Sequence, residues 1–244
     1  MEKKHILSGV LTAACTAVIL GLVLVKTRVA FRPNLQISFS PPPIAYGYAF
    51  RNVYISGVVY NDDGKTPVGA NRVVAVTFNG GSIRGTGATT STGHYLISPL
   101  SHSGAGVVVT AFVRNATEDA VTVTMLSGGN LLNFDLYRNR LIARADSGSF
   151  PLTISHLNTG DNNGATDLIS VYRSTSNSLA GTQSGKSLHI WRGDTFKPGG
   201  NVSAGSGITV AGTFQPEGNT VTLSGSWIKK STGTFTFATS TVVM

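Results

Sequence analysis

A weak internal repeat places the strongest constraint on what the C-terminal part of this chain can fold into. Three units share a Thr-Phe pair, a turn and an apolar strand, and their phenylalanines, Phe196, Phe214 and Phe235, are 18 and 21 residues apart. Such a period is typical of one coil of a parallel β-helix, in which equivalent residues of neighbouring coils stack in line. We therefore expect the start of a parallel β-helix, or β-solenoid, over residues 187–244. A β-meander of long hairpins has the same period and stays open as the alternative.

The third unit ends in an apolar strand, and no polar capping unit follows it. Solenoids need such caps to stay soluble. We therefore expect the chain to be a truncated piece of a longer repeat array.

The N-terminal part contains an uninterrupted apolar run over residues 6–25, ILSGVLTAACTAVILGLVLV, without a charged residue. At 1.5 Å per residue a helix of this length spans a hydrocarbon core of ~30 Å. Arg28 makes a poor cleavage context, so we expect residues 1–30 to be a signal-anchor transmembrane segment rather than a cleaved signal. Residues 31–52 contain four prolines and are expected to form a Pro-rich linker.

The chain as a whole has the composition of a β-protein, with 29 glycines and only 12% charged residues. Runs of β-branched residues at 53–60, 72–78, 106–113 and 121–125 are separated by turn residues, which predicts an antiparallel β-sandwich over 53–138. A further strand is expected over 136–142, and a connecting β and loop region over 139–186. The predicted fold class is thus all-β, with an N-terminal membrane helix, a sandwich and the start of a solenoid.

Two motifs of the predicted sandwich are similar to those of a known family. The first comprises residues 56–60, 63–64 and 67–70 (SGVVY, DG and PVGA), and the second is residues 89–97, TTSTGHYLI. In this order they resemble carboxypeptidase regulatory-like domains, although Ser91-Thr92 stands where those domains usually have an Asp. The resemblance implies a prealbumin-like sandwich that serves as a spacer or surface module, without catalytic residues.

The repeat region resembles the repeats of large bacterial surface proteins of the autotransporter-like or adhesin-like kind. The residues that carry this resemblance are the run 188–202, LHIWRGDTFKPGGNV, and the segments 225–227 and 233–235. The resemblance implies a cell-surface protein.

Patterns of enzymatic or metal chemistry are sparse in this sequence. The only cysteine, Cys15, lies inside the apolar run, and Asp194 and Glu217 are the only acidic residues after Asp167. Paired-carboxylate glycosidase chemistry would therefore require distant residues to converge. Of the net charge of +8, +3 lies in residues 1–30 and the remaining +5 is spread over the rest of the chain, whereas a nucleic-acid-binding protein concentrates its charge on one element. We expect no enzyme activity, no cofactor, no metal and no nucleic-acid partner.

Three aromatic residues are candidates for stacking on a sugar ligand: Tyr172, Trp191 and Trp227. The alternative is that they fill the core, as aromatics in β-solenoids commonly do. The expected function is a non-catalytic cell-surface scaffold or adhesin, anchored in the membrane through residues 6–25 and located in the cell envelope. A carbohydrate-binding accessory module of an envelope enzyme and a pilin-like filament subunit are the alternatives, and surface polysaccharide or other envelope components are the expected partners.

Overall fold

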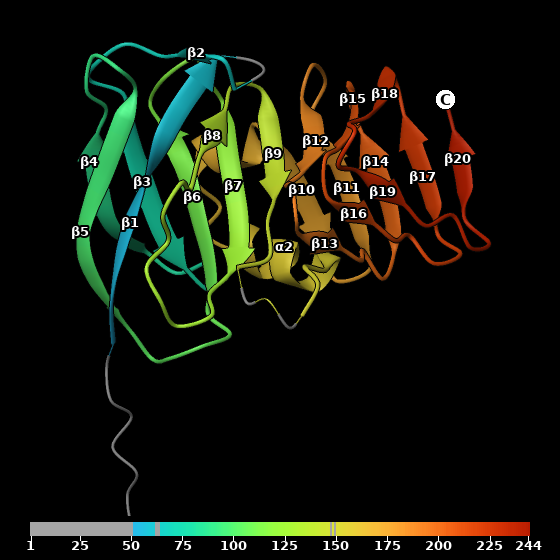
Figure 1. Cartoon of the computed structure of the whole chain (residues 1–244), viewed down its shortest axis with the longest axis horizontal. Helices are drawn as coiled ribbons and strands as arrows, with labels where there is room; N and C mark the ends of the chain where they lie inside the picture. Colours follow the sequence, from blue (N-terminus) through green and yellow to red (C-terminus); the bar gives the residue numbers. More distant parts are fainter. Residues whose placement is uncertain (1–50, 62–63, 147, 149) are drawn as a thin grey trace, which may run out of the picture. The chain divides into compact units, whose positions relative to one another are not determined.

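The computed structural model describes residues 51–61, 64–146, 148 and 150–244 (Figure 1). The predicted signal-anchor segment and nearly all of the predicted linker lie outside the described residues. Strand β1 begins at Arg51, so the last two residues of the predicted linker already belong to a sheet. None of the helices in the described range has the length and hydropathy needed to cross a bilayer.

Two facing sheets share a core in the first part of the described chain. In one sheet, β1 (Arg51–Asn61) pairs with β2 (Thr66–Pro67), β5 (His94–His102) and β8 (Leu136–Tyr137). The other contains the antiparallel strands β3 (Val73–Phe78), β4 (Ile83–Ala88), β6 (Val108–Arg114) and β7 (Ala120–Met125). Alternate residues of both sheets, such as Ile55 and Val76, are fully buried between them.

The second of these sheets does not end at the predicted boundary near residue 138. Beyond β7 it continues with the parallel strands β9 (Arg140–Ala143), β12 (Ser187–Ile190), β15 (Gly207–Val210) and β18 (Ser226–Lys229), giving eight strands in all. The prediction of a separate antiparallel sandwich over 53–138 is therefore corrected. The edge of β7 that does not pair with β6 pairs with the solenoid strand β9, so the strands of both parts belong to one sheet.

The strand predicted over 136–142 is divided in the structure. Asn139 adopts a left-handed conformation with φ of 59°, and the turn that it forms separates β8 from β9. Strand β8 pairs with β1 in the first sheet, whereas β9 pairs with β7 and β12 in the second. The solenoid consequently begins at Arg140 rather than at residue 187.

The three repeat units form three consecutive coils. They consist of β12, β13 (Thr195–Phe196) and β14 (Asn201–Ala204); β15, β16 (Thr213–Phe214) and β17 (Thr220–Leu223); and β18, β19 (Thr234–Phe235) and β20 (Thr241–Val243). Every strand pairs in parallel with its counterpart in the next coil. The parallel β-solenoid is confirmed, and the meander is excluded because its neighbouring strands would be antiparallel.

The preceding coil is wider and contains the only helices among the described residues. The helices α2 (Ile154–Asp161) and α3 (Thr166–Ile169) precede β10 (Tyr172–Thr175) and β11 (Ser178–Thr182), and β11 pairs in parallel with β14. Thr153 and His156 form a capping box that starts α2, and Ile154 and Leu157 are buried in the solenoid core. The predicted connecting region is thus a solenoid coil with two short helices.

The three repeat phenylalanines form one stacked column. Phe196 pairs with Phe214 and Phe214 with Phe235 in the parallel register, and the ring centroids are 5.8 Å apart at both steps. Phe214, with a coil on either side, has no exposed surface, and Phe235 in the last coil is only partly buried. The column predicted from the repeat is confirmed.

Close packing of neighbouring coils explains why a glycine precedes the Thr-Phe pair in the second and third units. A Cβ atom on Gly212 would lie 2.1 Å from the carbonyl oxygen of Trp191, and one on Gly233 would lie 2.0 Å from that of Val210. Only a residue without a side chain lets the backbones of neighbouring coils approach so closely.

Candidate functional site

Two of the three predicted stacking residues face the solenoid interior. Tyr172 has no exposed surface, and its hydroxyl donates to the carbonyl oxygen of Leu157 at 3.0 Å. Burial raises the pKa of the Tyr172 phenol well above its ordinary value. Trp227 is partly buried in β18, where its ring lies edge-on to Phe235 at 4.7 Å. Both residues therefore pack in the core.

The third, Trp191, belongs to an aromatic cluster on the outer face of the eight-stranded sheet. Its ring lies 5.9 Å from Tyr137 and 6.1 Å from His189, and the guanidinium of Arg144 lies over it at 5.5 Å. Tyr60 from β1 extends the cluster, 5.6 Å from Tyr137. Because β8 contributes Tyr137 and β12 contributes His189, the cluster attaches the first sheet to the solenoid.

His189 is the most perturbed titratable group of this cluster. It is 7% exposed, and its Nδ1 has no hydrogen-bond partner. Burial, together with the positive charges of Arg140 and Lys230, lowers the pKa of His189 to about 4. The imidazole is therefore neutral at physiological pH and acts as a packed ring rather than as a charged ligand.

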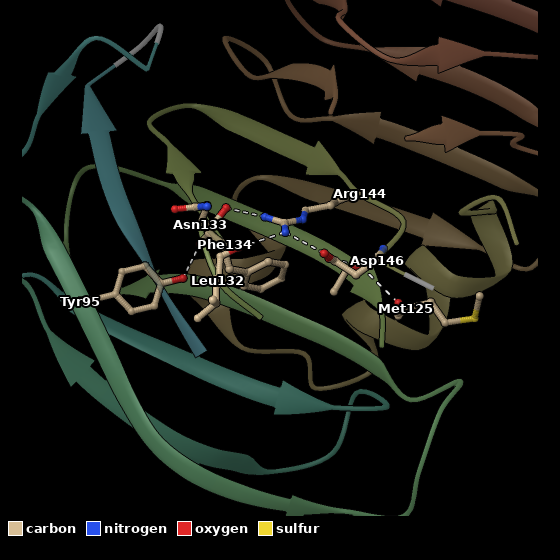
Figure 2. A network of polar contacts seen from close by, with 8 residues as sticks. Tyr95, Met125, Leu132, Asn133, Phe134, Arg144 and Asp146 are labelled. Carbon is tan, nitrogen blue, oxygen red and sulfur yellow. Dashed lines mark hydrogen bonds and ion pairs between the residues drawn. The ribbon is translucent and has the colours of Figure 1, made fainter. Parts of the chain in front are cut away.

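Arg144, whose guanidinium lies over Trp191, also forms a largely buried ion pair with Asp146. Figure 2 shows this pair. The Arg144 guanidinium donates to the Asp146 carboxylate at 2.6 Å, to the carbonyl oxygen of Leu132 at 3.1 Å and to that of Asn133. The second carboxylate oxygen of Asp146 accepts from the Thr124 hydroxyl at 2.8 Å. Because these hydrogen bonds join Arg144 and Asp146 to the carbonyl groups of Leu132 and Asn133, the pair fixes the loop before β8.

The same loop is held from the opposite sheet. Tyr95 of β5 donates its hydroxyl to the carbonyl oxygen of Phe134, and the Asp135 carboxylate accepts from the backbone N–H of Val58 at 2.9 Å. Burial raises the pKa of both Tyr95 and Asp135. These shifts are thus a consequence of burial, and the hydrogen bond from Val58 opposes the shift of Asp135.

An open groove lies on the side of the molecule where the chain enters α2. It consists of two adjoining clefts, of about 640 and 340 Å³, both of which are lined by Phe150 and Pro151. Phe150 is 66% exposed, although it is a large aromatic residue. We call the two clefts together the Phe150 groove.

The two halves of the Phe150 groove differ in polarity. The larger cleft is mainly apolar, with Met125 and Leu126 from the end of β7 facing Thr153 and His156 at the start of α2. The smaller cleft is polar and is lined by a second set of residues, Asp194, Thr195, Lys197 and Gln215. Lys197 and Gln215 directly follow the stacked Phe196 and Phe214, so the alternation of side chains directs them outward.

Among the described residues, Asp194 is the one carboxylate that lines the polar cleft. Burial raises its pKa, and the nearby Asp146 acts in the same direction, whereas a hydrogen bond from the backbone of Ala145 and the charge of Arg144 oppose the shift. Lys197 forms an ion pair with Glu217 at 2.8 Å, and both side chains are nearly half exposed. The cleft therefore presents a carboxylate, an ammonium and an amide within one small space.

Little in the amino-acid sequence indicates this groove. Phe150 stands alone in a stretch of Ser, Gly and Asp without periodicity, and Asp194 appeared only as one of two isolated acids. The only local signal is a large aromatic residue followed by proline in a run that is otherwise small and polar.

No cluster of three or more metal-ligating residues occurs in the described part of the chain. Comparisons of the chain with protein-family models, curated proteins and solved structures found no match. The groove is therefore interpreted from its own chemistry.

Proposed function

We propose that this chain is a non-catalytic cell-surface scaffold or adhesin that displays its β-solenoid outside the membrane. The observation that carries the proposal is the eight-stranded sheet, which runs from the antiparallel strands β4, β3, β6 and β7 into the solenoid strands. A continuous sheet has no flexible linker between its parts, so it holds the solenoid in a fixed orientation on its support. Such a rigid platform suits display and adhesion.

The apolar run over residues 6–25 supports the membrane-anchored part of the proposal. Its length suits a membrane span, and its charged flanks suit a signal-anchor segment. The absence of cysteine after residue 15 means that an exported domain would fold without disulfides, through strand pairing and core burial alone.

The proposed carboxypeptidase regulatory-like character of the first part is supported by the roles of its motif residues. Gly93 has φ of 74°, and a Cβ on it would lie 2.9 Å from the carbonyl oxygen of Val59. Tyr95, two residues later, is 3% exposed and packs in the core between the two sheets. The Gly-x-Tyr motif thus serves a turn and a core position, as the resemblance implies.

Site-directed thiol labelling in intact cells tests this proposal. Thr222→Cys places a thiol on an exposed position of β17, and Val221→Cys places one at a fully buried neighbour. We expect a membrane-impermeant maleimide to label the Thr222→Cys variant and to leave the Val221→Cys variant and the natural chain unlabelled. The protein should also stay with the membrane after carbonate extraction.

The control variant carries Leu20→Arg and Leu22→Arg, which make membrane insertion unfavourable. We expect this variant to leave the membrane fraction and to lose surface labelling of Thr222→Cys. Labelling that occurs only after cell lysis, or a natural chain that is recovered without the membrane, would overturn the proposal.

A carbohydrate-binding role is the second candidate, and a specific observation favours it. The Phe150 groove combines an exposed aromatic ring with hydrogen-bonding side chains of both charges. This combination is what small-molecule sites commonly use, an apolar surface with a few placed polar groups.

A further inference from the structure

We infer that the Phe150 groove binds a strand of neutral oligosaccharide, with one sugar ring packed on Phe150. The inference rests on the proposed function, since surface polysaccharide is available to an exported protein. It goes further by naming the chemical class of the ligand and the aromatic ring on which one sugar packs.

The size of the groove suits a short polymer. The two clefts, of about 640 and 340 Å³, both fall in the range of ~300–1,000 Å³ typical of ligand sites. They share Phe150 and Pro151, so a ligand that crosses Phe150 can occupy both clefts at once. An extended chain uses this arrangement better than a single compact molecule does.

The central aromatic ring suits the apolar face of a sugar. Phe150 is 66% exposed and forms no part of either buried core. An exposed aromatic ring between two clefts presents apolar surface where a ligand can cover it. Pro151 follows Phe150 in the chain, and its ring restricts the backbone. The segment that connects Phe150 to α2 is therefore stiff.

The polar cleft suits hydroxyl groups rather than a highly charged ligand. Asp194 accepts hydrogen bonds, Lys197 donates them and Gln215 does both. Glu217, which is paired with Lys197, offsets its positive charge, so a polyanion meets no net positive surface in this cleft. A sugar hydroxyl can both donate and accept, and it therefore matches this mixed set.

The apolar cleft suits a less polar part of the same strand. Ala105 and Pro151 supply apolar surface beside Phe150. Met125 and Leu126, which are 7% and 0% exposed, also line the cleft, and Thr153 and His156 lie at its α2 side. An acetamido methyl group is the apolar substituent that neutral sugars most readily offer. Gluco-oligosaccharides and N-acetylated oligosaccharides therefore share the stacking and hydroxyl contacts, and only the latter would also fill the apolar cleft.

The test is a titration of the purified full-length protein in detergent micelles by isothermal calorimetry. The probes are a cello-oligosaccharide and a chito-oligosaccharide of the same length, with a polyuronic acid and an apolar peptide as comparisons. We expect saturable binding of a neutral oligosaccharide, with tighter binding of the N-acetylated one, and little change in affinity on adding salt.

Three variants connect binding to the groove. Phe150→Ala should weaken binding by about tenfold or more, as expected when a central contact is truncated. Asp194→Asn keeps the shape of the side chain and should weaken binding by a smaller factor. The control is Phe237→Ala, which removes an aromatic ring that is 53% exposed in the last coil, and it should bind like the natural protein.

The inference is overturned if no neutral oligosaccharide binds, if the polyuronic acid or the peptide binds instead, or if Phe150→Ala binds as well as the natural protein. These outcomes are independent of cell location, because the protein is purified. Failure of surface labelling with intact sugar binding would remove the proposed function alone.

Discussion

Replacing Phe214 by alanine removes the central ring of the stacked column. The ring is fully buried and lies between Phe196 and Phe235, with both centroids 5.8 Å away. Truncation to alanine removes about 150 Å² of buried apolar surface, which at ~25 cal/mol per Å² amounts to a loss of about 4 kcal/mol of stability. This agrees with the ~3–5 kcal/mol usual for buried Phe→Ala changes that leave a cavity.

Phe235→Ala is the matched comparison, because the same side chain is removed one coil further along. Phe235 is only partly buried and has no coil beyond it in the described chain. About half the contact is lost, so we expect a cost of about 2 kcal/mol. The difference in the free energy of unfolding between the two variants measures how much packing against a coil on the second side contributes.

Urea unfolding followed by circular dichroism and by tryptophan fluorescence gives the free energy of unfolding for both variants. Phe214→Ala should lower it by about 4 kcal/mol, equivalent to a melting temperature about 10 °C lower for a chain of this size. A Phe235→Ala variant that is as destabilised as Phe214→Ala would refute the argument that burial between two coils sets the cost.

Two further predictions concern a glycine between coils and a buried histidine. Gly212→Ala should lower the free energy of unfolding by about 1–3 kcal/mol or more, because its Cβ would overlap the Trp191 carbonyl oxygen, whereas Gly129→Ala, with open space around it, should be nearly neutral in the same urea assay. His189 has a pKa of about 4 in the folded state against 6.5 ordinarily, so the unfolded state binds more protons between these values. Stability should therefore fall by up to about 3 kcal/mol as the pH drops from about 6.5 to about 4. His189→Gln should flatten this part of the stability profile, and an unchanged profile would contradict the assigned cause.

The sequence was most informative where one physical rule determines the structure. The Thr-Phe repeat predicted the coils because stacking in register brings equivalent residues together, as Phe196 and Phe214 demonstrate. The β-branched runs predicted β1, β3, β6 and β7 to within two or three residues, because β-branched residues favour strands and because β3, β6 and β7 are buried on both faces, which leaves nearly continuous apolar runs.

The wide first coil could not be predicted in the same way. Strand β9 is four residues long, and its partner β12 begins only at Ser187, so no local pattern connects them. The capping box of α2 has His156 at the position where Glu or Gln is the usual signal, and the burial of Leu157 against the solenoid is a tertiary feature. The Phe150 groove was missed for a related reason, since residues as distant as Met125 and Gln215 line it.

The mixed sheet also sets an order for folding. Strand β7 forms its antiparallel pair with β6 through a short turn, so its other edge is available early as a template. β9 can pair with β12 only after the wide coil between Ala143 and Ser187 has closed. This coil has the longest connecting segment of the solenoid, so its closure costs more conformational entropy than that of any later coil. Each later coil adds a short stretch of chain to a finished edge. Folding should therefore nucleate near β6 and β7 and proceed toward β20, in the direction in which the ribosome releases the chain.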